Sequence, residues 1–127
     1  MKLSIDNQDK YTVITIEEDS LNTLMAPDLK SEFVIQRNKG VQNLILDLAG
    51  VKFVDSSGLS AILTAERLWK NDGSFILTGV VHDSVKKLIK ISRLDTVLTI
   101  IPTVQESKDY VMMGEIEKEL ESDGGEE

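Results

Sequence analysis

The chain has 127 residues, of which 41% are hydrophobic and 28% are charged, and it contains no cysteine. Length and composition predict one globular domain with its own hydrophobic core. Without cysteine, disulfides, a thiolate metal site and a cysteine nucleophile are excluded. The N-terminal residues show neither a signal-peptide pattern nor an apolar run long enough to cross a bilayer, so we expect a cytoplasmic protein without a membrane partner.

The net charge of −8 is unevenly distributed along the chain. Residues 115–127 contain seven acids and one lysine, which gives this segment a net charge of −6 and leaves −2 for the rest. Charge-rich ends with few apolar residues are commonly disordered. We therefore expect a folded domain at 1–113 and an acidic, disordered tail at 114–127. Neither part has the basic surface that binding to nucleic acid requires.

The first third of the chain predicts a hairpin and a helix. Residues 3–16 contain two stretches of strand-like residues separated by a polar turn, which is typical of a β-hairpin. Residues 17–23 are polar and are expected to form a loop. Pro27 suits the first turn of a helix, and Gly40 stands where the cap after that helix belongs.

The rest of the chain alternates short apolar runs with helical periodicity. The expected elements are a central buried strand at 41–46, a helix at 59–69, a strand at 75–77, a helix at 85–92, a strand at 97–101 and a helix at 104–113. Trp69 lies on a wide apolar helix face and is expected in the core, and Met112 and Met113 are more often core residues than partner contacts. The order predicts an α/β fold, with a mixed sheet of four to five strands and helices mainly on one face.

Residues 55–58, with the sequence Asp-Ser-Ser-Gly, stand at the predicted start of the helix at 59–69. Ser and Asp commonly cap helices, and the glycine would let the backbone turn, so the motif is compatible with a purely structural role. The same position also suits a phosphorylated serine, because the first N–H groups of a helix lack intrahelical partners and attract negative charge. In α/β sheets, functional loops lie beyond the carboxyl ends of the strands, where this motif is placed.

Other chemical sites have weaker support. Asp47, Asp55 and His82 lack the spacing of a metal site. Ser56, Asp55 and His82 would form a catalytic triad only through one unsupported histidine, and His82 suits a helix cap. The sequence has neither a phosphate-binding glycine loop nor a nucleophile elbow. We therefore expect no enzyme activity, metal or cofactor.

The stretch VQNLILDLAGVKFVDSSGLSAIL, residues 41–63, resembles the central signature of the STAS domain, the family of bacterial anti-sigma factor antagonists. The signature combines an apolar strand ending in Asp, a short apolar loop, Asp-Ser-Ser or Asp-Ser-Thr, and Gly-Leu at the start of a helix. The resemblance extends over residues 1–112, because the expected hairpin and the later strands and helices also fall where the family has them.

The resemblance implies a phosphorylation-controlled binding switch. In such proteins the first serine after the aspartate, here Ser56, is phosphorylated by a partner that is both anti-sigma factor and serine kinase. The unphosphorylated form captures this partner and releases the sigma factor, and a serine phosphatase resets the switch. Asp55, Ser57, Gly58 and Asn22 are the expected supporting or partner-contact residues.

The sequence departs from the family at the loop before the first helix. Many members have Gly-x-Leu-Asp there, whereas residues 19–22 read Asp-Ser-Leu-Asn, with Asn22 at the position of the acid. Recognition by a kinase could differ for that reason. A STAS-type scaffold or transport-associated subunit without phosphorylation is the alternative function.

Overall fold

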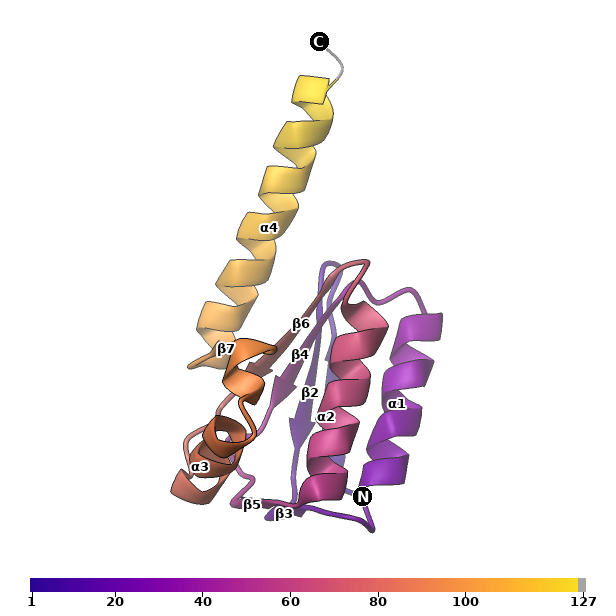
Figure 1. The fold of residues 1–127 in the computed structure, drawn as a ribbon. Coiled ribbons are helices and arrows are strands. Elements are labelled where there is room, and N and C mark those ends of the chain that lie inside the picture. Colours follow the sequence, from indigo (N-terminus) through magenta and orange to yellow (C-terminus); the bar gives the residue numbers. More distant parts are fainter. Residues whose placement is uncertain (126–127) are drawn as a thin grey trace.

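A five-stranded mixed sheet forms the centre of the computed structural model, which describes residues 1–125 (Figure 1). Its strands are β1 (Leu3–Asn7), β2 (Thr12–Ile16), β4 (Asn43–Asp47), β6 (Ser74–Thr78) and β7 (Thr99–Ile101), in the order β1-β2-β4-β6-β7. β1 runs antiparallel to β2, and the other neighbours are parallel. The predicted hairpin, the mixed sheet and the central position of β4 are confirmed.

Three helices cover one face of the sheet and the fourth covers the other (Figure 1). α1 (Ala26–Asn38), α2 (Ser56–Trp69) and α3 (Asp83–Ile91) pack on the first face, and α4 (Val104–Gly125) packs on the second. A short 3-10 helix, Leu94–Thr96, connects α3 to β7. The prediction that the helices lie mainly on one face is confirmed.

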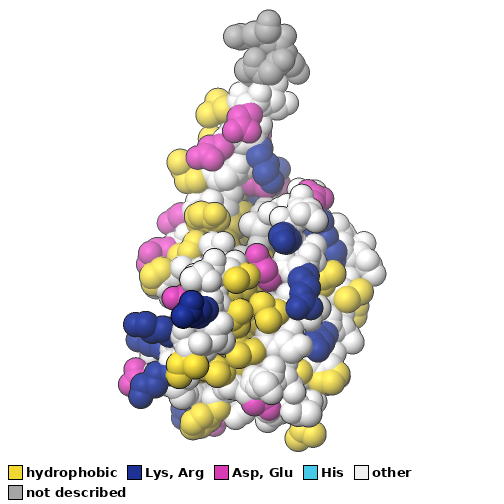
Figure 2. Space-filling model, viewed as in Figure 1, with side chains coloured by type: hydrophobic (Ala, Val, Ile, Leu, Met, Phe, Trp, Pro, Cys, Tyr) yellow, Lys and Arg dark blue, Asp and Glu magenta, His cyan; other side chains and the backbone are white. Residues whose placement is uncertain are grey.

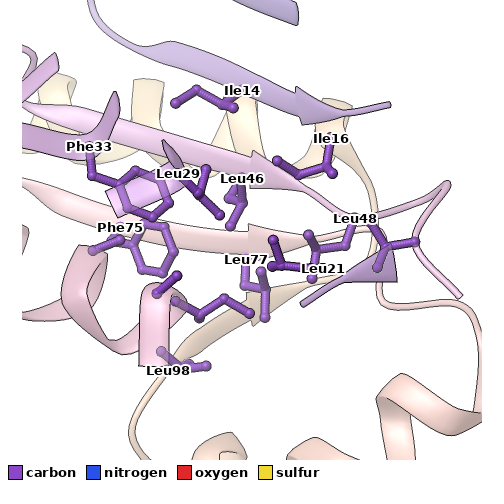
Figure 3. Close-up of a cluster of buried hydrophobic side chains, with 14 of the residues drawn as sticks. Ile14, Ile16, Leu21, Leu29, Phe33, Leu46, Leu48, Phe75, Leu77 and Leu98 are labelled. Carbon is purple, nitrogen blue, oxygen red and sulfur yellow. The ribbon is translucent and has the colours of Figure 1, made fainter. Parts of the chain in front are cut away.

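The main core lies between the sheet and α1 and α2, where large side chains from both layers interdigitate (Figure 3). Phe33 packs edge-on against Phe75 and Trp69, with ring centroids 6.1 and 6.3 Å apart. The Trp69 indole N–H donates to the carbonyl oxygen of Val41 at 2.9 Å, so its one polar atom is satisfied inside the core. The predicted core position of Trp69 is confirmed.

A second, very small sheet lies where the sequence predicted a loop. β3 (Ser20–Leu21) pairs in parallel with β5 (Phe53–Val54). Two residues are too few to show the alternation by which strands are recognised in a sequence. This ladder holds the segment before α1 beside the segment before α2, and it thereby builds the functional site.

α4 continues through Gly114 to Gly125 as one helix, whereas the sequence predicted that it ends at residue 113. The residues around this glycine include the good helix formers Met and Glu, and the cost of about 1 kcal/mol for one glycine does not end a helix by itself. Residues 126 and 127 of the expected tail lie outside the described residues. The expected division of the chain at residue 113 stays a prediction. Within residues 1–125, no helix is both long and apolar enough to span a membrane.

Candidate functional site

The site is built at the N-terminus of α2, at the end of the molecule where β3 and β5 lie (Figure 1). Asp55 is the N-cap residue, with extended backbone geometry, and its Oδ1 accepts a hydrogen bond from the Gly58 N–H at 2.9 Å. This arrangement satisfies a donor that the helix itself leaves free. The capping role considered for the motif is therefore present in the structure.

The other oxygen of Asp55 holds the loop before α1. Its Oδ2 accepts hydrogen bonds from the backbone N–H of Thr23 at 3.1 Å and from the Thr23 hydroxyl at 3.2 Å. The hydroxyls of Thr23 and Ser57 lie 3.0 Å apart. Since Thr23 donates its proton to Asp55, Ser57 donates to Thr23. The three side chains tie two loops together that are more than thirty residues apart in the sequence.

These donors keep Asp55 charged. The Gly58 N–H lowers the pKa of the Asp55 carboxyl below its ordinary value, and the Thr23 backbone, the Thr23 hydroxyl and the Ser57 N–H lower it further. Partial removal from water acts in the opposite direction but does not outweigh them. The site therefore presents one fixed negative charge at neutral pH.

Ser56 is the free hydroxyl of the motif. It is the first residue of α2, it is exposed, and within the described residues its hydroxyl makes no hydrogen bond. Ser57 is half-buried and bonded to Thr23. A modifying enzyme would therefore reach Ser56 without breaking an interaction, whereas reaching Ser57 requires opening the contact with Thr23.

The helix N-terminus is less available to a phosphate than the sequence suggested. Asp55 already accepts from the Gly58 N–H, and the Ser57 N–H also helps to lower the pKa of its carboxyl. None of the first three N–H groups of α2 has an intrahelical partner, and the one at Gly58 is already bonded to the Asp55 side chain. Negative charge added to Ser56 would stand beside the Asp55 carboxylate and would compete with it for the same donors.

Gly58 is required by packing, not by a turn of the backbone. A β-carbon at this position would collide with the carbonyl oxygen of Leu21 and would come within 2.8 Å of the Val54 side chain. The glycine therefore allows β3 and β5 to lie directly against the start of α2. This explains its place in the motif more specifically than conformational freedom does.

Asn22 shapes the loop before α1, and within the described residues no hydrogen bond joins its side chain to Ser56. Its Oδ1 accepts from the Leu24 N–H at 3.0 Å, and its backbone oxygen accepts from Met25 and Ala26. This is the local turn that asparagine and aspartate both form. An aspartate here would keep the turn and add a charge, so Asn22 makes the site less negative.

Three residues of this region were not among those predicted from the sequence. Thr23 connects Asp55 to Ser57, and Phe53 presents an apolar ring beside the motif, 60% exposed. Leu24 follows Thr23 and is 86% exposed. The pairing of β3 with β5 brings these segments together. Strands of two residues show no periodic pattern by which a sequence could reveal this pairing. Leu24 and Phe53 therefore expose apolar side chains on the segments that immediately precede α1 and α2.

The other candidate sites are not assembled in the described residues. The His82 Nε2 lies 3.2 Å from the carbonyl oxygen of Ala49, and no hydrogen bond joins His82 to Asp55 or Ser56. The Asp47 Oδ1 accepts from the Ala49 N–H at 2.9 Å. Residues 1–125 contain no group of three or more His, Asp or Glu side chains suited to a metal ion. No hydrogen-bonded base is therefore present at the Ser56 hydroxyl.

Comparison with known proteins identifies the family. The STAS domain profile matches residues 2–107, and the chain belongs to the STAS domain family. BtrV of Bordetella bronchiseptica, provisionally named an anti-sigma factor antagonist, is 30% identical over 93 residues, covering 72% of this chain and 78% of BtrV. The resemblance inferred from residues 41–63 is confirmed.

Solved structures show the same fold at lower identity. An anti-sigma factor antagonist from Mycobacterium paratuberculosis is 22% identical with a TM-score of 0.76, covering 87% of this chain and 93% of that chain. The antagonist SpoIIAA in its unphosphorylated form is 20% identical with a TM-score of 0.74, covering 87% and 96%. The phosphorylated form of SpoIIAA from Bacillus has a TM-score of 0.67 at 20% identity, covering 87% and 99%.

Proposed function

We propose that this protein is an anti-sigma factor antagonist controlled by phosphorylation of Ser56. Its unphosphorylated form binds an anti-sigma factor that is also a serine kinase, and the sigma factor is released. Phosphorylation by that kinase ends the binding, and a serine phosphatase restores it. Family membership, the name of BtrV and the two phosphorylation states of SpoIIAA support this proposal.

The observation that carries the proposal is the contrast between the two adjacent serines. Ser56 is exposed and its hydroxyl is not hydrogen-bonded within residues 1–125, whereas Ser57 is half-buried and bonded to Thr23. A kinase needs an accessible hydroxyl. A structural cap, in contrast, needs a bonded one, and Asp55 already supplies the cap.

The added charge is a physical reason why binding of the anti-sigma factor would depend on phosphorylation of Ser56. A phosphoserine carries about −1.5 to −2 charges at neutral pH. At Ser56 it would stand next to the exposed Asp55 carboxylate, while Leu24 and Phe53 are exposed on the segments that precede α1 and α2. A partner that fits the neutral serine would then have to desolvate unpaired charge, which costs a few kcal/mol at an interface. The fold itself need not change.

The assignment of the phosphosite is tested by mass spectrometry after incubation with the anti-sigma kinase and ATP. We expect phosphate on Ser56 in the wild-type protein and in Ser57→Ala, and none in Ser56→Ala. Circular dichroism serves as the control that both variants are folded. Phosphate on Ser57 in the wild-type protein would overturn the assignment, and a protein that binds partners without accepting phosphate would favour the constitutive scaffold.

A further inference from the structure

α4 has two apolar faces, and only one of them is covered. Val104 and Val111 pack on the sheet against Val13, Ile45 and Ile76. A second apolar row lies roughly 140 to 200° around the helix from Val111, at 100° per residue. We call this row the outer stripe; it consists of Met113, Ile116 and Leu120, which are 58, 46 and 65% exposed.

The outer stripe lies on the part of α4 that leaves the sheet. The last side-chain hydrogen bond between the described part of the helix and the sheet is that of Glu115, whose Oε1 accepts from the buried Asn43 amide at 2.9 Å. Beyond that point α4 projects past the end of the strands (Figure 1). On the visible side of this projection, hydrophobic and acidic side chains lie close together, with a basic side chain beside them (Figure 2).

The spacing of the outer stripe is that of a coiled-coil seam. Met113, Ile116 and Leu120 follow one another at intervals of three and four residues, as the a, d and a positions of a heptad do. The positions beside the seam, e and g, are Glu117 and Glu119. These are the positions that select the partner helix by charge.

The charges exclude a second copy of this chain as the preferred occupant. In a parallel pair, e residues face g residues of the other helix, and in an antiparallel pair each faces its own kind. Both arrangements would place glutamate against glutamate. The segment 115–127 has a net charge of −6, which adds to the repulsion between copies and from an anionic membrane surface.

We propose that the outer stripe is a docking site for a basic amphipathic helix of another protein. The apolar seam of that helix would cover Met113, Ile116 and Leu120, and its lysine or arginine side chains would face Glu117 and Glu119. The charges supply the specificity, and the burial of the three apolar side chains supplies the affinity. This interaction is independent of the state of Ser56.

The test uses the full chain and synthetic peptides about three heptads long. The first peptide has leucine at a and d and lysine at e and g, the second has glutamate at e and g, and the third has the scrambled sequence of the first. We expect the first peptide to bind about tenfold or more tightly than the scrambled peptide, and the acidic peptide not to bind. Isothermal titration calorimetry measures all three.

Two double substitutions test the contribution of the apolar seam and that of the flanking charges separately. Ile116→Gln with Leu120→Gln should lower affinity for the basic peptide about tenfold or more, because two buried apolar side chains are lost. Glu117→Lys with Glu119→Lys should reverse the preference toward the acidic peptide. Glu17→Lys with Glu18→Lys, which changes the net charge equally but lies outside α4, should not reverse it.

Three results would overturn the proposal. One is equal binding of the basic and scrambled peptides, since charge alone would explain it. Another is binding that survives the loss of Ile116 and Leu120. The third is a concentration-dependent dimer of the wild-type chain in sedimentation velocity that the same double substitution abolishes, because a second copy would then be the occupant.

Discussion

The Asp55 carboxylate couples the cap of α2 to the loop before α1, and its hydrogen bonds lower its pKa in the folded protein. A carboxyl group whose folded pKa lies below its unfolded pKa adds stability above the unfolded value. That stability is lost as the pH falls through the folded pKa. The stability that the Asp55 hydrogen bonds contribute should therefore decrease in acid.

The first prediction uses Asp55→Asn, which keeps the shape of the side chain but cannot titrate. The variant should be less stable than the wild-type protein near neutral pH, and the difference should shrink as the pH falls below 3.8, the ordinary value for this carboxyl. Urea denaturation at several pH values measures it. A stability difference that does not change with pH would show that the charge of Asp55 contributes nothing to the cap.

Thr23→Val gives the second prediction. Valine keeps the size of the side chain but removes the hydroxyl that donates to Asp55 and lies beside Ser57. The pKa of Asp55 should therefore rise relative to the wild-type protein, because the charged form loses a donor. An NMR titration of the Asp55 carboxyl measures it. An unchanged pKa would mean that the hydroxyl does not hold this carboxylate.

At the scale of the elements, two glycines in helices give opposite predictions. Gly58 has no room for a β-carbon, because Leu21 and Val54 lie against it. Gly114 lies within α4 with nothing within 4 Å of such a β-carbon. The first glycine permits close packing, and the second only weakens its helix.

The third prediction follows from this contrast. Gly58→Ala should lower the free energy of unfolding by about 1–3 kcal/mol through overpacking. Gly114→Ala should raise it by at most about 1 kcal/mol, because alanine is the better helix former. Chemical denaturation of both variants measures the pair. A destabilising Gly114→Ala would contradict a continuous α4.

Within the described residues, one side-chain hydrogen bond joins the part of α4 beyond Gly114 to the sheet. The Asn43 amide donates to the Lys10 carbonyl oxygen at 2.8 Å and to Glu115, and the Asn43 carbonyl oxygen accepts from Ser74 at 2.7 Å. Asn43 is buried, whereas the Glu115 side chain is 17% exposed. Removing Glu115 would leave one amide donor without its partner.

The fourth prediction concerns truncation of α4. The few apolar residues of 115–127 would by themselves predict that truncation after Gly114 leaves the thermal midpoint nearly unchanged, but the hydrogen bond between Glu115 and Asn43 changes this expectation. A chain ending at Lys118 should keep its midpoint, since it retains Glu115. A chain ending at Gly114 should lose about 1–2 kcal/mol of stability, the cost of a buried donor without its acceptor. Thermal unfolding of both truncations measures it. Equal midpoints would show that the contact with Asn43 contributes nothing.

The elements that sequence reasoning located were those with a continuous physical signal. β4 is an unbroken apolar run, and α2 carries a wide apolar face, so both were predicted together with the hydroxyl motif between them. β3 and β5 are too short for periodicity, and the role of Thr23 arises only once these strands pair. The outward face of α4 was missed because apolar residues on both sides of a helix give no clear amphipathic pattern.

At the scale of the whole molecule, the two candidate binding surfaces lie at opposite ends. The Ser56 site stands where α2 begins, at the end that holds β3 and β5, and α4 projects beyond the other end (Figure 1). Most of the net negative charge belongs to the segment that forms the end of the chain, because residues 115–127 carry −6 of the total of −8. A partner at Ser56 and a helix on α4 could therefore bind together.

The central claim is that charge at Ser56 decides whether the anti-sigma partner binds. Ser56→Asp introduces one of the nearly two negative charges of a phosphate, and Ser56→Ala keeps the surface neutral. Aspartate is favourable in the first turn of a helix, and within residues 1–125 the Ser56 hydroxyl makes no hydrogen bond that either variant would lose, so both variants should stay folded. Circular dichroism checks this. Ser122→Asp, on the distal part of α4, adds the same charge far from the site.

Titration calorimetry of these proteins against the isolated anti-sigma factor is the most direct measurement. We predict that Ser56→Asp weakens binding by two or more orders of magnitude, which corresponds to about 3 kcal/mol. Wild-type protein, Ser56→Ala and Ser122→Asp should bind alike. Equal affinities of wild-type protein and a folded Ser56→Asp variant would contradict the claim, because charge at the start of α2 would then not control the complex.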